Sequence, residues 1–476
     1  MERLVRIRRV QHRCDTANRG VGLSGESGIR SQGRRTGGEM HVHGRGRCGH
    51  HGSGRTLESV EHRLSGCRAR TSSAEHALSR RSRLWGSRLM SMPILRRRPN
   101  SGLGNIRSSL GSPRRNIDWV LISTVVILAV VGAFAIYSAT FWKIDGDPYW
   151  FATRQVIFII ASGVALAVVM SFDYTLLNDR AYFLYGVSII ALLLVLSAGA
   201  LRGGARLSFD LGPIAFQPAE FAKPAVLVAL AAYYSESRES VMSYSQFITG
   251  LLLVGVPVAL IIVQPDLGSA FVMIVGAICV LVMAGAKLRY LLLISMLTVA
   301  TIAAAIVAGI VDRYQLRRIE AFINQNSSEE SLQQYVFQVR YAKRAVATGG
   351  WFGKGYLQGP LTNGKFIPVQ QSDFIFSAVA EQFGMIGGGL VVGLFGLMLF
   401  RIWRVANLAR DAFGSYLCAG IFGVVLWHVF QNIGMTMGIM PVTGVPLPFV
   451  SYGGSSLIAF AIMIGLVESV HMRRLR

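Results

Sequence analysis

Long apolar runs separated by short polar connections dominate the chain from residue 117 onward. A membrane-spanning helix needs about 20 mostly apolar residues, and ten runs meet or approach this length. They lie near residues 118–140, 151–171, 181–200, 215–234, 246–263, 267–286, 289–312, 373–400, 413–437 and 450–470. The pattern predicts an all-α polytopic membrane protein with about ten transmembrane helices.

One polar interval, residues 313–372 between the seventh and eighth runs, is much longer than the others. It is rich in Gly and ends at Asp373, a carboxylate placed where the next apolar run begins. Its basic residues are Arg313, Arg317, Arg318, Arg340, Lys343, Arg344, Lys354 and Lys365. A basic loop at a membrane surface suits an anionic lipid-linked substrate, and a carboxylate at its edge suits proton transfer.

Composition supports a membrane protein, with 52% hydrophobic and only 15% charged residues. The net charge of +23 is unevenly divided, because residues 1–116 contain 25 Arg, no Lys and 7 acids and so contribute +18. The five Cys have neither disulfide nor metal-ligand spacing, which argues against a thiol-based function.

Residues 1–116 form an Arg-rich tail that lacks hydrophobic periodicity, so we expect it to be disordered. A tail that binds anionic lipid or nucleic acid, a transit peptide, and a start assigned too far upstream all remain open. The absence of Lys favours the last interpretation, with synthesis beginning at Met90 or Met92. The membrane domain then comprises residues 117–476, and we expect no nucleic-acid partner.

Orientation follows from the Arg and Lys residues of the short loops, which gather on the cytoplasmic side. The bias predicts that both termini are cytoplasmic and that residues 313–372 form a large extracytoplasmic loop between helices 7 and 8. Its positive charge is compatible with this side, because long loops are exempt from the rule.

Four polar clusters lie within or beside the apolar runs, where ionisable groups are costly and usually functional. In QPAEFAK (217–223), Glu220 and Lys223 can form an intrahelical ion pair. Asp266 of QPDLGSA (264–270) and Asp373 of QSDFIF (371–376) can each cap the following helix or serve the function. The fourth cluster, GVPLPFVSYGGSS (444–456), predicts irregular backbone at membrane depth, which needs cover from protein.

Together these four motifs, in this order, resemble the SEDS family (shape, elongation, division and sporulation) of ten-span membrane glycosyltransferases. The segments GKGYLQG (353–359) and PVTGVPLP (441–448) are more similar to its rod-shape branch than to its division branch. The resemblance implies polymerisation of lipid II into peptidoglycan strands for cell elongation, at the bacterial inner membrane and facing the periplasm. It also implies a class B penicillin-binding protein and other membrane proteins of the elongation complex as partners, beside membrane lipids.

The resemblance makes Asp373 the catalytic residue. It further assigns substrate binding to Glu220, Lys223, Asp266, Ser451, Tyr452 and Gly453. The chain departs from the family where an acid and a base usually precede the aspartate, since it has Val369 and Gln370 there. It also lacks a Trp near Ser208.

The expected chemistry needs a base for the sugar hydroxyl, which we assign to Asp373, and cations for the departing pyrophosphate. The outward-facing candidates for the second role are Arg206, Arg340, Arg344 and Lys354. A divalent cation, Mg²⁺ or Mn²⁺, is conceivable because Asp266 and Asp373 offer oxygens, but no metal-ligand constellation is present. A lipid flippase or transporter, and a non-catalytic scaffold of the elongation complex, are the alternatives.

Overall fold

The computed structural model describes residues 116–141, 147–202, 205–211, 214–236, 242–307, 309, 313–325 and 329–475. The predicted disordered tail, up to residue 115, lies outside the described residues, as do the candidate start sites Met90 and Met92.

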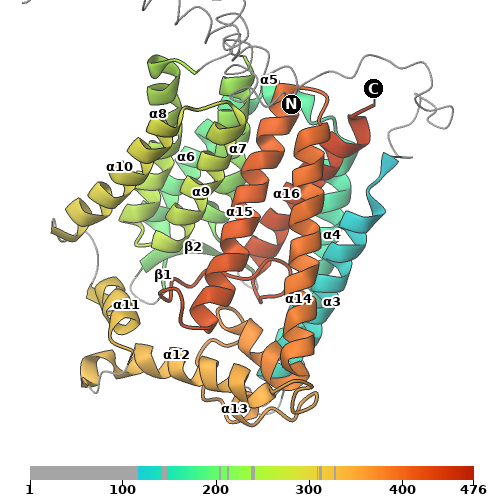
Figure 1. Ribbon diagram of the computed structural model, residues 1–476, viewed down its shortest axis with the longest axis vertical. Helices are drawn as coiled ribbons and strands as arrows, with labels where there is room; N and C mark the ends of the chain where they lie inside the picture. The colour runs from blue at the N-terminus through green and yellow to red at the C-terminus, as the bar shows by residue number, and fades with distance from the viewer. Residues whose placement is uncertain are drawn as a thin grey trace, which may run out of the picture. The chain divides into compact units, whose positions relative to one another are not determined.

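Ten long helices occupy the ten apolar runs and form one bundle (Figure 1). They are α3 (Trp119–Thr140), α4 (Trp150–Ser171), α6 (Ala181–Ala198), α7 (Pro218–Ser235), α8 (Tyr244–Val263), α9 (Leu267–Met283), α10 (Leu288–Val307), α14 (Ile375–Leu408), α15 (Ala412–Thr436) and α16 (Gly454–Arg473). A short helix, α5 (Thr175–Asp179), connects α4 to α6. The predicted all-α polytopic fold is confirmed.

Seven described helices are long and apolar enough to cross a membrane by length and composition: α3, α4, α6, α8, α14, α15 and α16. Helix α9 is apolar too but has only 17 residues. Helix α7 differs because it contains Glu220 and Lys223, and most of its residues are buried. It is an interior helix, which other helices shield from lipid.

A small antiparallel sheet between α6 and α7 was not predicted. It consists of β1 (Ala200–Arg202), β2 (Ala205–Leu211) and β3 (Ile214–Phe216) in the order β1-β2-β3. The predicted fourth span, 215–234, therefore begins three residues late, at Pro218, because residues up to Phe216 pair with β2. The sheet lies against the start of α16, where the Ser455 hydroxyl donates to the Ala215 carbonyl.

The long polar interval folds into α11 (Arg313–Ile323), α12 (Glu330–Gly349) and α13 (Pro360–Asn363). Figure 1 shows these helices across one end of the bundle, opposite the end where the C-terminus lies. A separate small core holds α12 there, formed by Ala342, Ala345, Ile367, Phe374, Met435 and Val442. The interval is thus a packed cover over the bundle.

Helix α14 is interrupted at Gly384, whose φ of 65° and ψ of −162° are not helical. The turn after α12 replaces the missing helical bonds. Lys354 and Gly355 donate to the carbonyls of residues 381 and 382, and residues 385 and 386 donate to the carbonyls of Gly350 and Trp351. Glycine is needed at 384 because a Cβ there would lie 2.4 Å from the Gly353 nitrogen.

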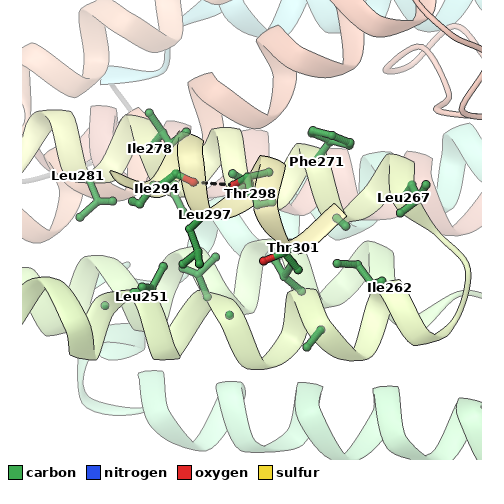
Figure 2. Close-up of a pocket in the computed structure, with 18 residues that line it drawn as sticks. Leu251, Ile262, Leu267, Phe271, Ile278, Leu281, Ile294, Leu297, Thr298 and Thr301 are labelled. Carbon is green, nitrogen blue, oxygen red and sulfur yellow. Dashed lines mark hydrogen bonds between the residues drawn. The ribbon is translucent and has the colours of Figure 1, made fainter. Parts of the chain in front are cut away.

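Helix α9 separates two cavities of opposite character. Figure 2 shows the first, an apolar cavity of about 150 Å³ between α8, α9 and α10, which Leu267 and Phe271 help to line. Asp266 and Ser269, at the same end of α9, line a polar cavity instead. The second cavity brings the predicted motifs together.

Candidate active site

A polar cavity of about 140 Å³ collects residues from all four sequence motifs. We call it the acid cavity, because three of its lining residues are the carboxylates Glu220, Asp266 and Asp373. The other lining residues are Gln217, Ser269, Ser372, His428, Gly444, Val445 and Pro446. Segments far apart in the sequence therefore meet at one point.

The backbone around Asp373 is clamped by buried side chains. Asn432 of α15 is fully buried, and its amide donates to the Asp373 carbonyl at 2.9 Å and to the Val445 carbonyl at 2.8 Å. The Ser451 hydroxyl donates to the Ser372 carbonyl and accepts from the Leu447 amide at 2.9 Å. These bonds fix the position from which the Asp373 side chain projects.

The Asp373 carboxylate itself is less constrained. It accepts a hydrogen bond from the Ser372 hydroxyl at 2.7 Å, and it does not cap α14, whose N-cap residue is Phe374 without a side-chain bond. Burial raises the pKa of Asp373, while the Ser372 hydrogen bond and the nearby Arg318 charge lower it. The result is a partly desolvated carboxylate of the kind that suits a general base.

Arg318, on α11, lies between the cover and the acid cavity. Its guanidinium donates to the Val442 carbonyl at 3.3 Å and interacts electrostatically with both Asp373 and Asp266. Helix α11 is held in place by Gln315, whose side chain donates to the Pro265 carbonyl at 2.5 Å. This arginine is therefore the cation of the basic loop that reaches the catalytic candidate.

Asp266 has two roles in the wall of the cavity. One oxygen caps α9 by accepting from the Ser269 amide at 2.9 Å, as predicted. The other accepts from the Gln217 side chain at 3.3 Å. The carboxylate thus orders the start of α9 and also holds Gln217 in the cavity wall.

Glu220 and Lys223 form the predicted intrahelical ion pair, at 2.7 Å and almost fully buried. Lys223 also lies 3.2 Å from Nε2 of His428, and Nδ1 of His428 lies 3.0 Å from the Pro446 carbonyl. Because an ammonium can only donate, Nε2 accepts and Nδ1 holds the proton. The second oxygen of Glu220 is buried and has no hydrogen-bond partner among the described residues. Glu220 is one of the residues that line the acid cavity.

Several predicted binding residues lie outside the acid cavity. Arg340, Arg344 and Lys354 are exposed on the cover. Arg340 contacts the Gln325 carbonyl at 3.5 Å, and Arg344 lies 5.3 Å from the Tyr341 ring. The backbone of Arg206 pairs with that of Leu201 on the sheet.

The three predicted binding residues of the SYGG motif have different surroundings. Ser451 is buried and used entirely in the clamp on the Asp373 segment. Tyr452 and Gly453 line a neighbouring cavity, and the Tyr452 amide donates to the Gln371 carbonyl at 2.9 Å.

Sequence reasoning missed the parts played by Gln217, Arg318, His428 and Asn432. His428 appears in the sequence as a lone His in an apolar run, a pattern more typical of packing. Arg318 is one of many cations in its interval, and no local signal separates it from the others. The polar residues of QN at 431–432 in an apolar helix were the signal that could have revealed Asn432.

The positions where the family has charges before the aspartate are filled differently here. Gln370 is buried, and its amide donates to the hydroxyls of Thr362 and Ser377, each at 3.1 Å. The residue therefore stabilises the loop and does not face the acid cavity. As for metals, no group of three His, Cys, Asp or Glu side chains within the described residues could hold an ion. We assign no step to one.

Comparison with known proteins agrees with this arrangement. Residues 118–475 match the FtsW, RodA and SpoVE family, described as cell cycle proteins. The chain is 33% identical to stage V sporulation protein E of Bacillus subtilis over 362 residues, which cover 74% of this chain and 96% of that protein. It is 34% identical to peptidoglycan glycosyltransferase MrdB of Escherichia coli over 352 residues, with coverages of 73% and 93%.

A solved structure on the structural coordination of polymerization and crosslinking by a peptidoglycan synthase complex contains a similar chain. Its TM-score is 0.64 at 30% identity, and the match covers 75% of this chain and 98% of that one. The near-equal identities to a sporulation protein and to MrdB do not single out one branch. The chain belongs to the FtsW, RodA and SpoVE family, the SEDS family that its motifs resemble.

Proposed function

We propose that this protein is a peptidoglycan glycosyltransferase that polymerises lipid II. The observation that carries the proposal is the Asp373 carboxylate, which opens into the acid cavity while its backbone is clamped by Asn432 and Ser451. The match covers nearly the whole length of relatives named peptidoglycan glycosyltransferase, which supports the same activity here.

In the proposed reaction, the 4-hydroxyl of one sugar attacks the anomeric carbon of a lipid-linked sugar. Asp373 takes the hydroxyl proton as the new C–O bond forms, and the bond to the pyrophosphate breaks, so that the pyrophosphate leaves with the electron pair. Burial raises the pKa of Asp373, and the charge of Arg318 opposes this effect and so favours the ionised form of the carboxylate. The fixed backbone supplies the orientation that such a reaction needs.

We further propose that the active site faces the periplasm, with both termini in the cytoplasm. The Arg and Lys distribution of the short loops supports this orientation. The cover formed by α11, α12 and α13 would then lie on the outer surface of the inner membrane. A role in cell elongation is our proposal for the growth stage, on the basis of the rod-shape motifs.

A class B penicillin-binding protein is the proposed partner, because the similar chain comes from a complex that coordinates polymerisation with crosslinking. Helix α14 offers a surface for a partner's membrane helix. A Cβ on Gly389, Gly393 or Gly396 would meet nothing within 4 Å, so these small residues lie on an open face of the helix. Small residues at such spacing let two membrane helices approach closely.

The decisive experiment is polymerisation of labelled lipid II in liposomes by the protein beginning at Met92, with and without the partner. Asp373→Asn keeps the size of the side chain but cannot accept the proton, so we expect the rate to fall about 10²–10⁴-fold. Asp210→Asn on β2 is the matched control, because Asp210 lies outside the acid cavity.

Two outcomes would contradict the proposal. Polymerisation by Asp373→Asn at the unmutated rate would remove the assigned base. An absence of polymer from the unmutated protein, even with the partner, would favour a flippase or scaffold, which transbilayer movement of labelled lipid II would separate.

A further inference from the structure

A cluster of charged residues connects three helices near the end of the bundle where the C-terminus lies, opposite the cover (Figure 1). The proposed reaction does not use it. At its centre is Asp118, the N-cap of α3, whose carboxylate accepts two hydrogen bonds from the Arg401 guanidinium of α14, the one from Nε at 2.7 Å. The Asp118 amide donates to the Glu468 carboxylate of α16 at 2.6 Å. Asp118 therefore holds α14 and α16 together at this level.

The two carboxylates of this cluster lie below the surface. Asp118 is 3% exposed and Glu468 is fully buried. Besides its bonds to Arg401, the Asp118 carboxylate accepts from the Leu121 amide at 3.2 Å. The second oxygen of Glu468 is buried and makes no hydrogen bond with a described residue. Neither carboxylate is therefore exposed to pair with a cation at the surface.

Two further arginines, Arg404 and Arg474, lie closer to this end of the bundle. Arg404 follows Arg401 by one turn of α14, and Arg474 directly follows the last residue of α16. Both helices begin near the acid cavity, which residues 372–373 and 444–446 help to line, and both run toward the end where the C-terminus lies (Figure 1). The two arginines therefore lie beyond the buried carboxylates.

The charges of Arg404 and Arg474 act on each other. Arg404 is exposed and makes no hydrogen bond or ion pair with a described residue. Burial lowers the pKa of Arg474, and the charge of Arg404 lowers it further, so the two guanidiniums repel each other. Asp118 and Glu468 oppose this shift without reversing it. A pair of cations that repel each other at a surface attracts an anion.

Arg474 is held in place by an uncharged side chain. Its Nη1 lies 3.3 Å from Nδ1 of His471. Because a guanidinium can only donate, Nδ1 accepts this bond and carries no proton, so the imidazole is neutral. The contact orients Arg474 without offsetting its charge. The segment that leads into α3 adds no opposite charge either, because residues 76–117 contain no Asp or Glu.

The surface beside these cations is apolar and aromatic. Trp403, next to Arg404 in α14, is 42% exposed, and Trp119, next to Asp118 in the chain, is 69% exposed. Exposed tryptophans are typical of the level at which lipid headgroups meet the hydrocarbon. Phe400, one turn before Arg404 on the same face of α14, is exposed as well. This end of the bundle thus offers cations at the headgroup level and an apolar helix surface for acyl chains.

We propose that Arg404 and Arg474 bind the phosphodiester of an anionic membrane phospholipid, whose acyl chains lie along α14. A guanidinium matches a phosphate with two parallel N–H···O bonds, and basic sites between membrane helices are typical of anionic headgroups. A zwitterionic phospholipid fits less well, because its own ammonium group offsets the attraction of its phosphate to the two arginines. The inference is independent of the proposed function, since this cluster and the acid cavity share no residue.

The test is a titration of the full-length protein in detergent with phosphatidylglycerol and, separately, with phosphatidylcholine, in which native mass spectrometry counts the bound lipid. We expect phosphatidylglycerol to bind more tightly. Arg404→Gln should weaken its binding about fivefold, and the double variant Arg404→Gln, Arg474→Gln about 25-fold, as expected for the loss of one and two cations beside an anionic lipid. Binding of phosphatidylcholine should stay nearly unchanged. Inorganic phosphate at the lipid concentration should not displace phosphatidylglycerol, because it lacks the acyl chains.

Arg410→Gln is the matched control, because Arg410 is an exposed arginine in the loop between α14 and α15. We expect this variant to bind both lipids as the unmutated protein does. Equal binding of the two lipids by the unmutated protein would overturn the proposal. So would displacement of phosphatidylglycerol by inorganic phosphate, which would indicate a site for the free ion. Unchanged phosphatidylglycerol binding by the double variant would also overturn it and favour an acidic protein segment as the ligand. If the double variant does not fold, unchanged binding by Arg404→Gln, a change at an exposed position, overturns it.

Discussion

Two carboxylates on one short stretch, Asp373 and Glu381, have opposite surroundings. Glu381 is fully buried and accepts from the Leu361 amide at 2.8 Å, the Thr362 amide at 2.9 Å and the Thr362 hydroxyl at 2.6 Å. Asp373 accepts one side-chain hydrogen bond and faces a cavity. The difference indicates that the number of filled acceptor positions, more than burial, distinguishes a structural acid from one available for chemistry.

The largest effect is expected from Glu381→Leu. This change leaves the Leu361 and Thr362 amides of α13 without an acceptor, and each orphaned buried donor costs about 1–3 kcal/mol. We expect a marked fall in the thermal midpoint of the purified protein, with activity lost in proportion to the folded fraction. Glu320→Leu, at an exposed position on α11, is the control. A stable but inactive Glu381→Leu protein would contradict the structural assignment.

Glu220 has one filled and one unfilled acceptor oxygen, because one oxygen pairs with Lys223 and the other has no hydrogen-bond partner among the described residues. Lys223→Met leaves a buried carboxylate without its partner, which costs about 3–5 kcal/mol. Thermal unfolding should show the loss, and the double variant Glu220→Gln, Lys223→Met should recover part of it. Lys287→Met, at an exposed position, should change nothing. An undiminished stability of Lys223→Met would show that the pair is not needed.

A smaller effect concerns pH. Burial raises the pKa of Asp373 and Arg318 lowers it, so the polymerisation rate should fall with decreasing pH at a point above the ordinary Asp value of about 3.9. Arg318→Met removes the lowering charge, so the acidic limb of the pH–rate profile should move to higher pH. Arg317→Met, the exposed neighbour, should leave the limb in place. A shift of the acidic limb toward lower pH would exclude the proposed effect of Arg318 on the pKa of Asp373.

The smallest effects are expected on the cover. Arg340, Arg344 and Lys354 are exposed and lie outside the acid cavity. Replacing each by Gln should change the free energy of unfolding by no more than about 0.5 kcal/mol and leave the rate with lipid II nearly unchanged. A large rate loss in any single variant would show that the cover binds substrate directly, as its composition first indicated.

The sequence was sufficient to predict the ten helices, the Asp266 cap and the Glu220–Lys223 pair. Each depends on neighbouring residues, through an apolar run, a helix breaker or a spacing of one turn. The sheet before α7 was not predictable, because its strands are short and stabilised by contact with α16. The inward position of Arg318 depends on a bond between Gln315 and Pro265, which are 50 residues apart.

The break in α14 could not be predicted from the sequence either, because residues 375–408 form one nearly continuous apolar pattern. The bonds that replace the missing helical ones come from the turn at 350–355, which precedes the helix in the chain. Only the folded structure shows that a glycine in this helix is required by a backbone contact.

The clamp on the Asp373 segment has a consequence for biosynthesis. Ser451 and Tyr452 bond the carbonyls of Ser372 and Gln371, and both residues lie just before the last helix of the bundle. During synthesis from the N-terminus, a ribosome-bound chain that has already inserted nine helices still lacks these bonds. These bonds to the segment of the proposed base form only when the final helix arrives, so we expect a prematurely terminated chain to occupy the membrane without consuming precursor.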